Sequence, residues 1–384
     1  MKTQLLIWSL PIFLTGLFSC GENDTAQETG SQNILENLSY SVDTLIVDPG
    51  EEIINLAFGL RLSDLSPDKK KLYLLNEVNQ SLAVIDLDQL RLVDQNQFEK
   101  EGPNGIGEYI SSVQVVNSEQ FAFTSYRSSG IFNRSGEKVL DLNFSSKDIE
   151  GMDMEDEMPM NYGLTLSLDN GQAFALPGDF FKGTRDLAVV NPVKKTGQLI
   201  DIPEMDKTSE FRIVLKSKDM MSIYEEELDL SLIENILYLT NSASTDIYRY
   251  DYLNDSLQLF SFQPTLFPNA KTGPVKNEVS SESEWKAEME KLRTQIGFEK
   301  LLWDEKSQRF YRFARKYYPR ENPDDPSRAD VYLMAFDKDL NLIGEKQLDE
   351  LRSTPSYPFF KDDKLLSYVN VEDELGFAVF TFDF

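Results

Sequence analysis

The chain has 384 residues, 41% of them hydrophobic and 11% aromatic, which is enough for one large or two ordinary domains with a sizeable core. Its formal net charge of −27 argues against nucleic-acid binding and against direct adhesion to anionic lipid, because a basic footprint is missing. Histidine is absent and Cys20 is the single cysteine, which excludes Ser-His-Asp catalysis, His-ligated zinc and an intramolecular disulfide. The acidity is explained by solubility, or by an acidic face for cations or basic partners.

The N-terminus has the pattern of a secretory signal. Met1-Lys2 precedes an apolar run from Leu5 to Phe18, which is short for a membrane span. The segment Leu17-Phe18-Ser19-Cys20 resembles the bacterial lipobox, in which cleavage before the cysteine leaves its thiol lipidated. We therefore expect a signal peptide over residues 1–19 and a lipid anchor such as palmitate on Cys20; the alternative is a signal peptide with an incidental cysteine.

The next segment, residues 20–39, is mostly polar and predicts a flexible linker between the lipid and the body. Residues 40–384 are expected to form the folded domain.

A repeated pattern indicates the architecture of that domain. Leu72-Tyr73-Leu74-Leu75-Asn76 is followed after nine residues by Asp86, and Leu237-Tyr238-Leu239-Thr240-Asn241 is followed after nine residues by Asp251. Each copy is an apolar strand, a polar turn and a second strand that ends at Asp. Pairs of an apolar residue and Asp or Asn recur at uneven spacing along the chain: Ile85-Asp86, Phe132-Asn133, Val190-Asn191, Tyr250-Asp251, Phe336-Asp337 and Phe382-Asp383.

These repeats predict an all-β fold, a six-bladed β-propeller of four-stranded antiparallel blades. The last unit has strands near 358–360, 365–369 and 377–382 and lacks a fourth. Tyr40–Val47 is predicted to be a strand and belongs to none of the repeated units. We expect this N-terminal strand to complete the last blade and to close the ring, which also removes exposed edges.

The segment Pro264–Glu299 departs from the strand pattern and predicts a helical insertion. Ser281 with Glu284 forms a capping-box pattern, and Trp285, Met289, Leu292 and Ile296 lie on one helical stripe. The helix either packs over the propeller or acts as a lid.

The chain resembles an uncharacterised family of Bacteroidetes six-bladed β-propeller lipoproteins. The resemblance rests on the lipobox, the blade pattern, the segment Gly102-Pro103-Asn104-Gly105-Ile106-Gly107 and Phe310-Tyr311-Arg312. It covers most of the mature chain and implies the propeller fold. It implies no established activity, so no catalytic residues are carried over.

Long loops on a rigid scaffold often carry function, and here they are expected on one face. In a propeller the second-to-third turns and the links between blades share a face. The long segments 97–108, 145–160, 264–299 and 315–329 fall in this set. Arginines with aromatic residues can hold carboxylates, phosphates or sugar rings, although for any single residue surface ion pairing and loop packing are the more common explanation. The ligand-binding candidates are Asn104, Tyr126, Arg127, Asp179, Arg185, Asn241, Tyr311 and Arg312.

The sequence holds no specific catalytic or cofactor motif; Ser283 and Lys286 match the pattern Ser-x-x-Lys, but such a short pattern arises easily by chance. The acidic stretch 151–157 lacks the ligand order of a calcium loop, Gly105-Ile106-Gly107 opens no helix, and there is no phosphate-loop or Gly-x-Ser-x-Gly motif. We expect no metal and no cofactor.

The leading hypothesis is therefore a lipid-anchored protein of the outer membrane, periplasmic or surface-facing, that binds an unidentified ligand or envelope protein through its long-loop face. The alternatives are an envelope hydrolase or lyase that uses carboxylates, Arg, Tyr or a metal in the central channel, and a structural subunit of an outer-membrane assembly. Paired carboxylates with raised pKa in the channel would favour the enzyme, and a channel plugged by apolar side chains would weaken it.

Overall fold

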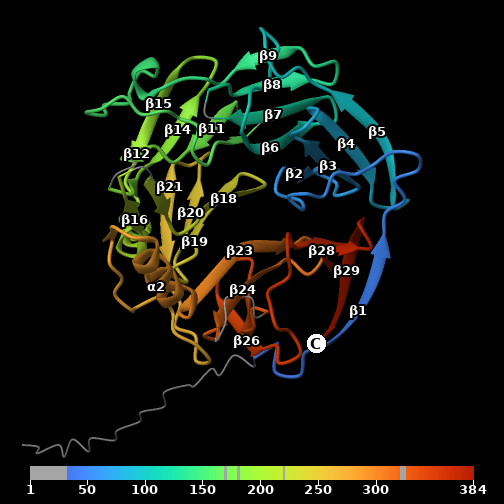
Figure 1. Cartoon of the computed structure of the whole chain (residues 1–384), viewed down its shortest axis with the longest axis vertical. Coiled ribbons are helices and arrows are strands. Elements are labelled where there is room, and N and C mark those ends of the chain that lie inside the picture. Colours follow the sequence, from blue (N-terminus) through green and yellow to red (C-terminus); the bar gives the residue numbers. More distant parts are fainter. Residues whose placement is uncertain (1–32, 126, 168–170, 180–181, 219–220, 321–325) are drawn as a thin grey trace, which may run out of the picture. The chain divides into compact units, whose positions relative to one another are not determined.

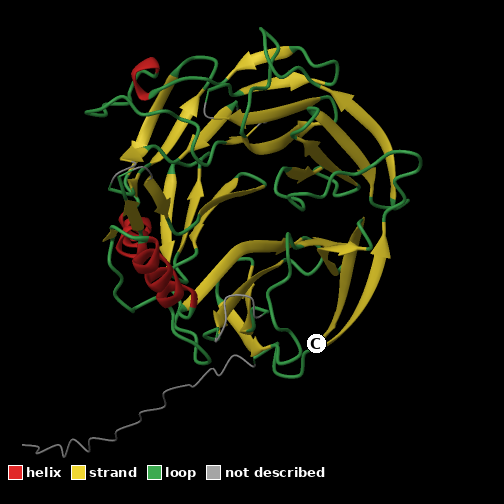
Figure 2. Cartoon of the chain, in the orientation of Figure 1, coloured by secondary structure: helices red, strands yellow, loops and turns green. Residues whose placement is uncertain are grey.

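The computed structural model describes residues 33–125, 127–167, 171–179, 182–218, 221–320 and 326–384. The chain divides into two units, Met1–Gln32 and Asn33–Phe384, and all described residues lie in the second. Strands dominate this unit and helices are few (Figure 2). None of the helices in the described ranges has the length and apolarity needed to span a bilayer.

Six four-stranded antiparallel sheets make up most of the unit. In hydrogen-bonding order, the first three are β2 (Ser63–Leu65), β3 (Lys71–Asn76), β4 (Ser81–Asp86), β5 (Arg91–Gln97); β6 (Ile110–Asn117), β7 (Gln120–Ser125), β8 (Gly130–Asn133), β9 (Lys138–Asp141); and β10 (Thr165–Ser167), β11 (Gln172–Ala175), β14 (Leu187–Asn191), β15 (Thr196–Ile200). The last three are β18 (Leu228–Ile233), β19 (Ile236–Asn241), β20 (Ile247–Asp251), β21 (Ser256–Phe260); β23 (Ile296–Asp304), β24 (Arg309–Tyr317), β25 (Ala329–Asp337), β26 (Leu342–Gln347); and β27 (Phe359–Lys361), β28 (Lys364–Val371), β29 (Glu374–Asp383), β1 (Ser39–Ile46).

Strands such as β3 consist of consecutive apolar residues because both faces of their sheet pack against neighbouring sheets. Successive residues of a strand point to opposite faces. In β3, Leu72 and Leu74 therefore pack in one hydrophobic cluster with Phe377 of the last sheet, whereas Tyr73 and Leu75 pack in another with Phe121 of the second sheet. A strand that is buried on both faces needs apolar residues at every position, so strict alternation is lost.

Six hydrophobic clusters link the sheets in a cycle. Each cluster joins two sheets that follow each other in the chain, and one of them joins the last sheet to the first. The first strands of successive sheets also contact one another, from β2 and β6 through to β23 and β27. The sheets consequently follow one another around a common centre (Figure 1).

The N-terminal strand completes the last sheet, as predicted. β1 pairs antiparallel with β29 over its whole length, from Ser39 opposite Asp383 to Ile46 opposite Gly376. The pairing covers the edge that β29 would otherwise expose.

The predicted flexible linker over residues 20–39 is wrong in its last seven residues; residues 20–32 lie outside the described part. Leu35 is fully buried and Leu38 is 5% exposed, both in the cluster between the fifth and sixth sheets. The backbone N–H of Ile34 donates to the oxygen of Ile343 at 3.0 Å. The hydrophobic contacts outweigh the polar composition that suggested a linker.

The pairs of an apolar residue and Asp or Asn mark one position in every sheet. All six pairs are the last two residues of the third strand. In most sheets the polar side chain accepts a hydrogen bond from the turn that follows, for example Asp86 from the N–H of Gln89 and Asn191 from the N–H of Lys194, both at 2.8 Å. The repeat thus encodes a turn that the side chain stabilises.

Two long links between sheets build an accessory layer that the sequence analysis predicted only in part. One link holds α1 (Pro203–Asp206), the 3₁₀ helix η2 (Lys207–Phe211), β16 (Ile213–Lys216) and β17 (Met221–Tyr224); the other holds β22 (Glu278–Val279) and α2 (Glu282–Arg293). These strands form a three-stranded sheet in the order β17-β16-β22. The remaining short elements are η1 (Ser146–Asp148), β12 (Gly178–Asp179) and β13 (Thr184–Arg185).

The predicted helix exists and is shorter than the expected stripe. The side chain of Ser281 accepts a hydrogen bond from the N–H of Glu284, as the capping-box pattern predicts. Leu292 is buried against the accessory sheet, with Trp285 and Met289 beside it. Ile296 is not on the helix: it begins β23, because the chain leaves the helix after Arg293.

Candidate functional site

The loops of the described unit are unequal in length, as expected. The turns from first to second and from third to fourth strands are short, such as 118–119 and 252–255. The links between sheets are long, such as 142–164, 201–227 and 261–295. We call the side on which these links and the second-to-third turns lie the long-loop face.

A central hollow of about 780 Å³ lies at this face. Most of its lining residues lie at the start of the first strand of a sheet, or in the link just before that strand. Its polar and charged lining comes from Arg61, Ser63, Asp64, Ser111, Ser112, Gln114, Asn161, Thr165, Asp229 and Lys300. Polar side chains therefore occupy much of the wall, and the hollow is not plugged by apolar ones.

Asp64 is the carboxylate of the hollow with the most perturbed titration. Its Oδ2 accepts a hydrogen bond from the N–H of Val115 at 2.7 Å, and its Oδ1 accepts one from the N–H of Leu65 at 2.9 Å. Burial nevertheless raises the pKa of Asp64 to about 6, because loss of water disfavours the charged form more than these bonds favour it. The bond to Val115 also ties β2 to β6.

The second carboxylate of the hollow, Asp229, forms an ion pair. Its Oδ1 lies 2.6 Å from Nζ of Lys300, and the attraction raises the pKa of that lysine. The pair ties β18 to β23. The hollow thus holds two carboxylates in different surroundings: Asp229 is paired with Lys300, and Asp64 is desolvated by burial.

The second hollow, which we call the α2 pocket, has a volume of about 750 Å³. It is formed by α2, the links that flank it and the ends of β17 and β24, so two of the predicted long loops build it. It is lined by Tyr224, Lys271, Trp285, Lys286, Met289, Glu290, Leu292, Arg293, Gln295, Gly297, Arg315, Tyr317 and Arg320.

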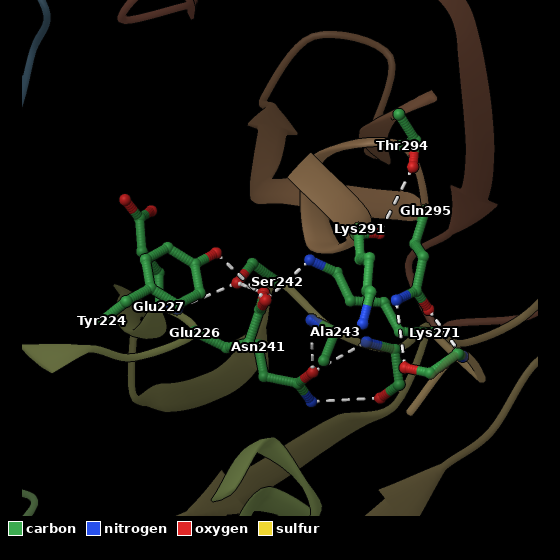
Figure 3. Close-up of polar contacts among 12 residues, drawn as sticks. Tyr224, Glu226, Glu227, Asn241, Ser242, Ala243, Lys271, Lys291, Thr294 and Gln295 are labelled. Atoms are coloured by element: carbon green, nitrogen blue, oxygen red, sulfur yellow. Dashed lines mark hydrogen bonds and ion pairs between the residues drawn. The ribbon is translucent and has the colours of Figure 1, made fainter. Parts of the chain in front are cut away.

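Lys271, which lines the α2 pocket, forms a buried ion pair with Glu226 (Figure 3). Nζ of Lys271 lies 2.7 Å from Oε1 of Glu226, and their side chains are 6% and 0% exposed. The hydroxyl of Tyr224 donates to Oε1 at 3.0 Å, and the hydroxyl of Ser242 donates to Oε2. Burial lowers the pKa of Lys271, whereas burial and the charge of Glu226 raise that of Tyr224.

The segment between β21 and β22 that carries Lys271 is hydrogen-bonded to Gln295, the residue before β23. Oε1 of Gln295 accepts hydrogen bonds from the N–H groups of Thr272 and Gly273 at 3.0 and 2.7 Å, and its Nε2 donates to the oxygen of Gly273 at 3.1 Å. Oε2 of Glu288 accepts a bond from the N–H of Lys276 at 3.1 Å. These bonds hold α2 as a wall of the pocket.

Three of the predicted site residues are structural. Tyr311 and Arg312 are 1% and 0% exposed, and Asn241 is 2% exposed, so they line neither hollow. Tyr311 packs on Phe360, with ring centroids 5.1 Å apart. Oδ1 of Asn241 accepts bonds from the N–H groups of the turn that follows it.

The other predicted residues are dispersed. Asn104 Oδ1 accepts a bond from the N–H of Lys138 at 3.1 Å, Arg127 is exposed, and Asp179 lies 3.5 Å from Nζ of Lys182. Tyr126 and the lipidation site Cys20 lie outside the described residues. Arg185 lies beside the central hollow: its guanidinium carbon is 3.5 Å from the ring centroid of Tyr162, which lines that hollow.

The sequence analysis did not single out Glu226 and Lys271, the buried ion pair at the α2 pocket. Glu226 stands in the run Glu225-Glu226-Glu227, and a run of carboxylates is usually a solvated segment. Its neighbour Glu225 also turns inward and pairs with Arg185 and Arg212 at 3.3 and 2.8 Å. Arg315 and Arg320 did fall within a predicted long loop, but no residue of it was singled out.

Comparisons with known proteins place the chain in a family. The family described as a domain of unknown function, DUF4221, matches residues 33–347. The chain belongs to this family. Among curated proteins, none matches it.

Two solved structures are similar to the chain in fold. A member of the same family from Bacteroides vulgatus is 14% identical with a TM-score of 0.63, covering 90% of this chain and 98% of that one. A putative exported protein from Bacteroides fragilis is 14% identical with a TM-score of 0.51, covering 91% of this chain and 96% of that one. At this identity, the likeness to both neighbours concerns the fold.

Proposed function

We propose that this DUF4221 protein is a lipid-anchored component of the cell envelope that folds as a six-bladed β-propeller and binds a ligand through its long-loop face. The observation that carries the proposal is that two hollows of about 780 and 750 Å³, with charged walls, both lie at that face. Hollows of this size accommodate small molecules or the tip of a partner chain.

The propeller is supported by the cycle of six clusters and by the pairing of β1 with β29. In this arrangement each sheet is a blade and the central hollow is the mouth of the channel. Helix α2 and its flanking arm are then an insertion between the fourth and fifth blades.

The lipid anchor rests on Cys20 and the apolar run that precedes it, and export is supported by the structural neighbour described as a putative exported protein. The test is expression in a Gram-negative host, followed by membrane fractionation and mass spectrometry of the N-terminal peptide. We expect acylated Cys20 in the membrane fraction and release of the Cys20→Ser variant. An unmodified thiol in a soluble wild-type protein would remove the anchor from the proposal.

Ligand binding is tested by thermal unfolding of the purified protein with oligosaccharides, peptides, nucleotides, organic acids and calcium. A ligand that binds only the native state raises the unfolding temperature. The shift should vanish in variants of one hollow, Lys300→Gln or Arg315→Gln, and persist in Lys364→Gln, whose exposed side chain lies in neither. A shift that all three variants retain would contradict the long-loop face as the site. No shift from any class would favour a protein partner.

An enzymatic function is the second candidate, and Asp64 is the observation that favours it. A carboxyl with pKa about 6 in a polar hollow can donate or accept a proton near neutral pH. Any ligand found by unfolding should therefore be incubated with wild type and Asp64→Asn and its products analysed. Conversion by wild type alone would favour a hydrolase or lyase; an unchanged ligand with both would favour binding.

A further inference from the structure

The lining of the α2 pocket is rich in cations, although the chain as a whole is strongly acidic. Five cationic side chains line it, those of Lys271, Lys286, Arg293, Arg315 and Arg320, together with one carboxylate, Glu290. Lys271, Arg293 and Arg315 pair with Glu226, Glu290 and Glu299. The net charge of the chain is −27. A pocket lined mainly by cationic side chains attracts anions.

Two of these cations contact the same aromatic ring. The guanidinium carbons of Arg293 and Arg315 lie 5.3 and 5.5 Å from the ring centroid of Tyr317. Arg293 is also fixed by two bonds of 2.7 Å to Glu290, and Arg315 by an ion pair with Glu299. The two guanidinium groups are thus oriented before any ligand arrives, which lowers the entropic cost of binding.

One donor of this pair has no acceptor. Nη1 of Arg293 is buried, and no residue in the described part of the chain accepts a hydrogen bond from it. Its Nε and Nη2 are engaged by Glu290 and the backbone oxygen of Tyr318. A buried donor without a partner is costly. Because Arg293 lines the pocket, an anionic oxygen inside it could accept this bond.

The rest of the wall is apolar or aromatic. Trp285, Met289 and Leu292 from α2 face the pocket together with the rings of Tyr224 and Tyr317. Inorganic ions gain nothing from such surfaces, whereas an aromatic or aliphatic body buries its apolar area against them.

We propose that the α2 pocket binds a small organic anion, in which a carboxylate or phosphate group is joined to an aromatic or aliphatic body. Arg293 and Arg315 hold the anionic group, and Trp285 and Tyr317 contact the body. The inference rests on the proposed ligand-binding function and adds to it the ligand's chemical class and its hollow.

The test is calorimetric titration of the full-length protein in a neutral detergent with matched pairs of probes. The pairs are indole-3-acetate with indole-3-acetamide, hexanoate with hexanamide, and phenyl phosphate with phenol; inorganic phosphate is added as a head group without a body. We expect one anion at least to bind about ten-fold more tightly than its neutral counterpart and than inorganic phosphate.

Variants assign the binding to the pocket. Arg293→Gln and Arg315→Gln should each lower the affinity for the anion about ten-fold. Lys364→Gln, which also removes one positive charge, should leave this affinity unchanged. Because the two arginines also pair within the fold, Lys286→Glu on the exposed face of α2 serves as a variant without buried contacts. It should weaken the anion severalfold with unchanged thermal unfolding.

The outcomes separate this inference from the proposed function. Equal affinity for anions and neutral counterparts, or no binding by any probe, would overturn the anion assignment. Binding that Lys300→Gln abolishes and the α2-pocket variants leave intact would place a ligand in the central hollow, which overturns this inference and supports the proposed function. Inorganic phosphate binding as tightly as the organic anions would overturn the role of the apolar wall.

Discussion

Nη2 of Arg312 donates a hydrogen bond of 2.7 Å to the backbone oxygen of Asn241, which joins the fifth sheet to the last residue of the repeated strand in the fourth. Nε of the same guanidinium donates to the backbone oxygen of Glu299 at 2.8 Å, and its carbon lies 5.2 Å from the ring of Phe298. Burial lowers the pKa of Arg312 to about 9, so the group remains charged at neutral pH. It is a fully buried cation whose bonds go to backbone oxygens.

Replacing Arg312 by Met should therefore lower the free energy of unfolding by about 2–4 kcal/mol, because two buried carbonyl oxygens lose their donors. Arg312→Lys should lose much of the same amount, since one ammonium group cannot reproduce the planar fork. Chemical denaturation measures both. The control is Arg328→Met at an exposed position, expected within about 0.5 kcal/mol of wild type. A stable Arg312→Met protein that bound ligand more weakly would restore Arg312 as a site residue.

Asp64 should make stability depend on pH. Its pKa of about 6 in the folded chain exceeds the value of 3.8 expected without the fold, so the native state binds the proton more tightly. This contribution is complete below pH 4 and is lost as pH rises through 6. The free energy of unfolding of Asp64→Asn, relative to that of wild type, should therefore increase by up to about 3 kcal/mol between pH 4 and 7. Denaturation curves at several pH values measure the difference. A constant difference would show that the carboxyl is hydrated in solution.

The pair of Glu226 and Lys271 should couple strongly. Lys271→Met leaves a fully buried carboxylate without its cation, and we expect a loss of about 3–5 kcal/mol. In Lys271→Met with Glu226→Gln the loss should be smaller than for Lys271→Met alone, because the amide needs no counter-ion. A double-mutant cycle by chemical denaturation measures the coupling. Additive losses would mean that the two side chains act independently.

Much of the sheet architecture could be read from the sequence because its turns are encoded locally. Asp86 and Asp251 each end a third strand and cap the turn after it, so their recurrence reports the repeat directly. The edge pairing of β1 with β29 followed from counting strands. The accessory sheet was missed because β16 and β22 lie far apart in the sequence and pair in parallel over two residues, which leaves no periodic trace.

The site was harder to predict because burial decides the role of a charged residue. Arg312 and Arg315 belong to one strand and differ by three positions, yet Arg312 faces the core and Arg315 lines the α2 pocket. The α2 pocket does contain arginines beside aromatic rings, the chemical type that the sequence analysis sought for a site. Which arginines line the pocket depends on their contacts with α2 and with the segment before it. The sequence alone does not show how these segments lie relative to β24.

Two glycines offer a matched test of a close approach between backbones. Gly151 and Gly171 both have positive φ, +90° and +62°. A Cβ on Gly151 would lie 2.3 Å from the backbone oxygen of Gly197, whereas one on Gly171 would meet nothing within 4 Å among the described residues. In both alanine variants the positive φ should lower the free energy of unfolding by about 1 kcal/mol. In Gly151→Ala the clash with Gly197 should lower it further. Thermal unfolding compares them, and equal losses would show that the 149–152 loop moves aside without cost.

The segment before β1 should behave as part of the core. Leu35 is fully buried among residues of the fifth and sixth sheets, including Leu333 and Phe380. Leu35→Ala should therefore cost about 2–5 kcal/mol, as for other buried leucines, and Glu36→Ala on the exposed side of the same turn should cost little. The measurement is chemical denaturation of the full-length variants. If Leu35→Ala were as stable as wild type, the segment would be the flexible linker that its composition suggested, and β1 alone would complete the last sheet.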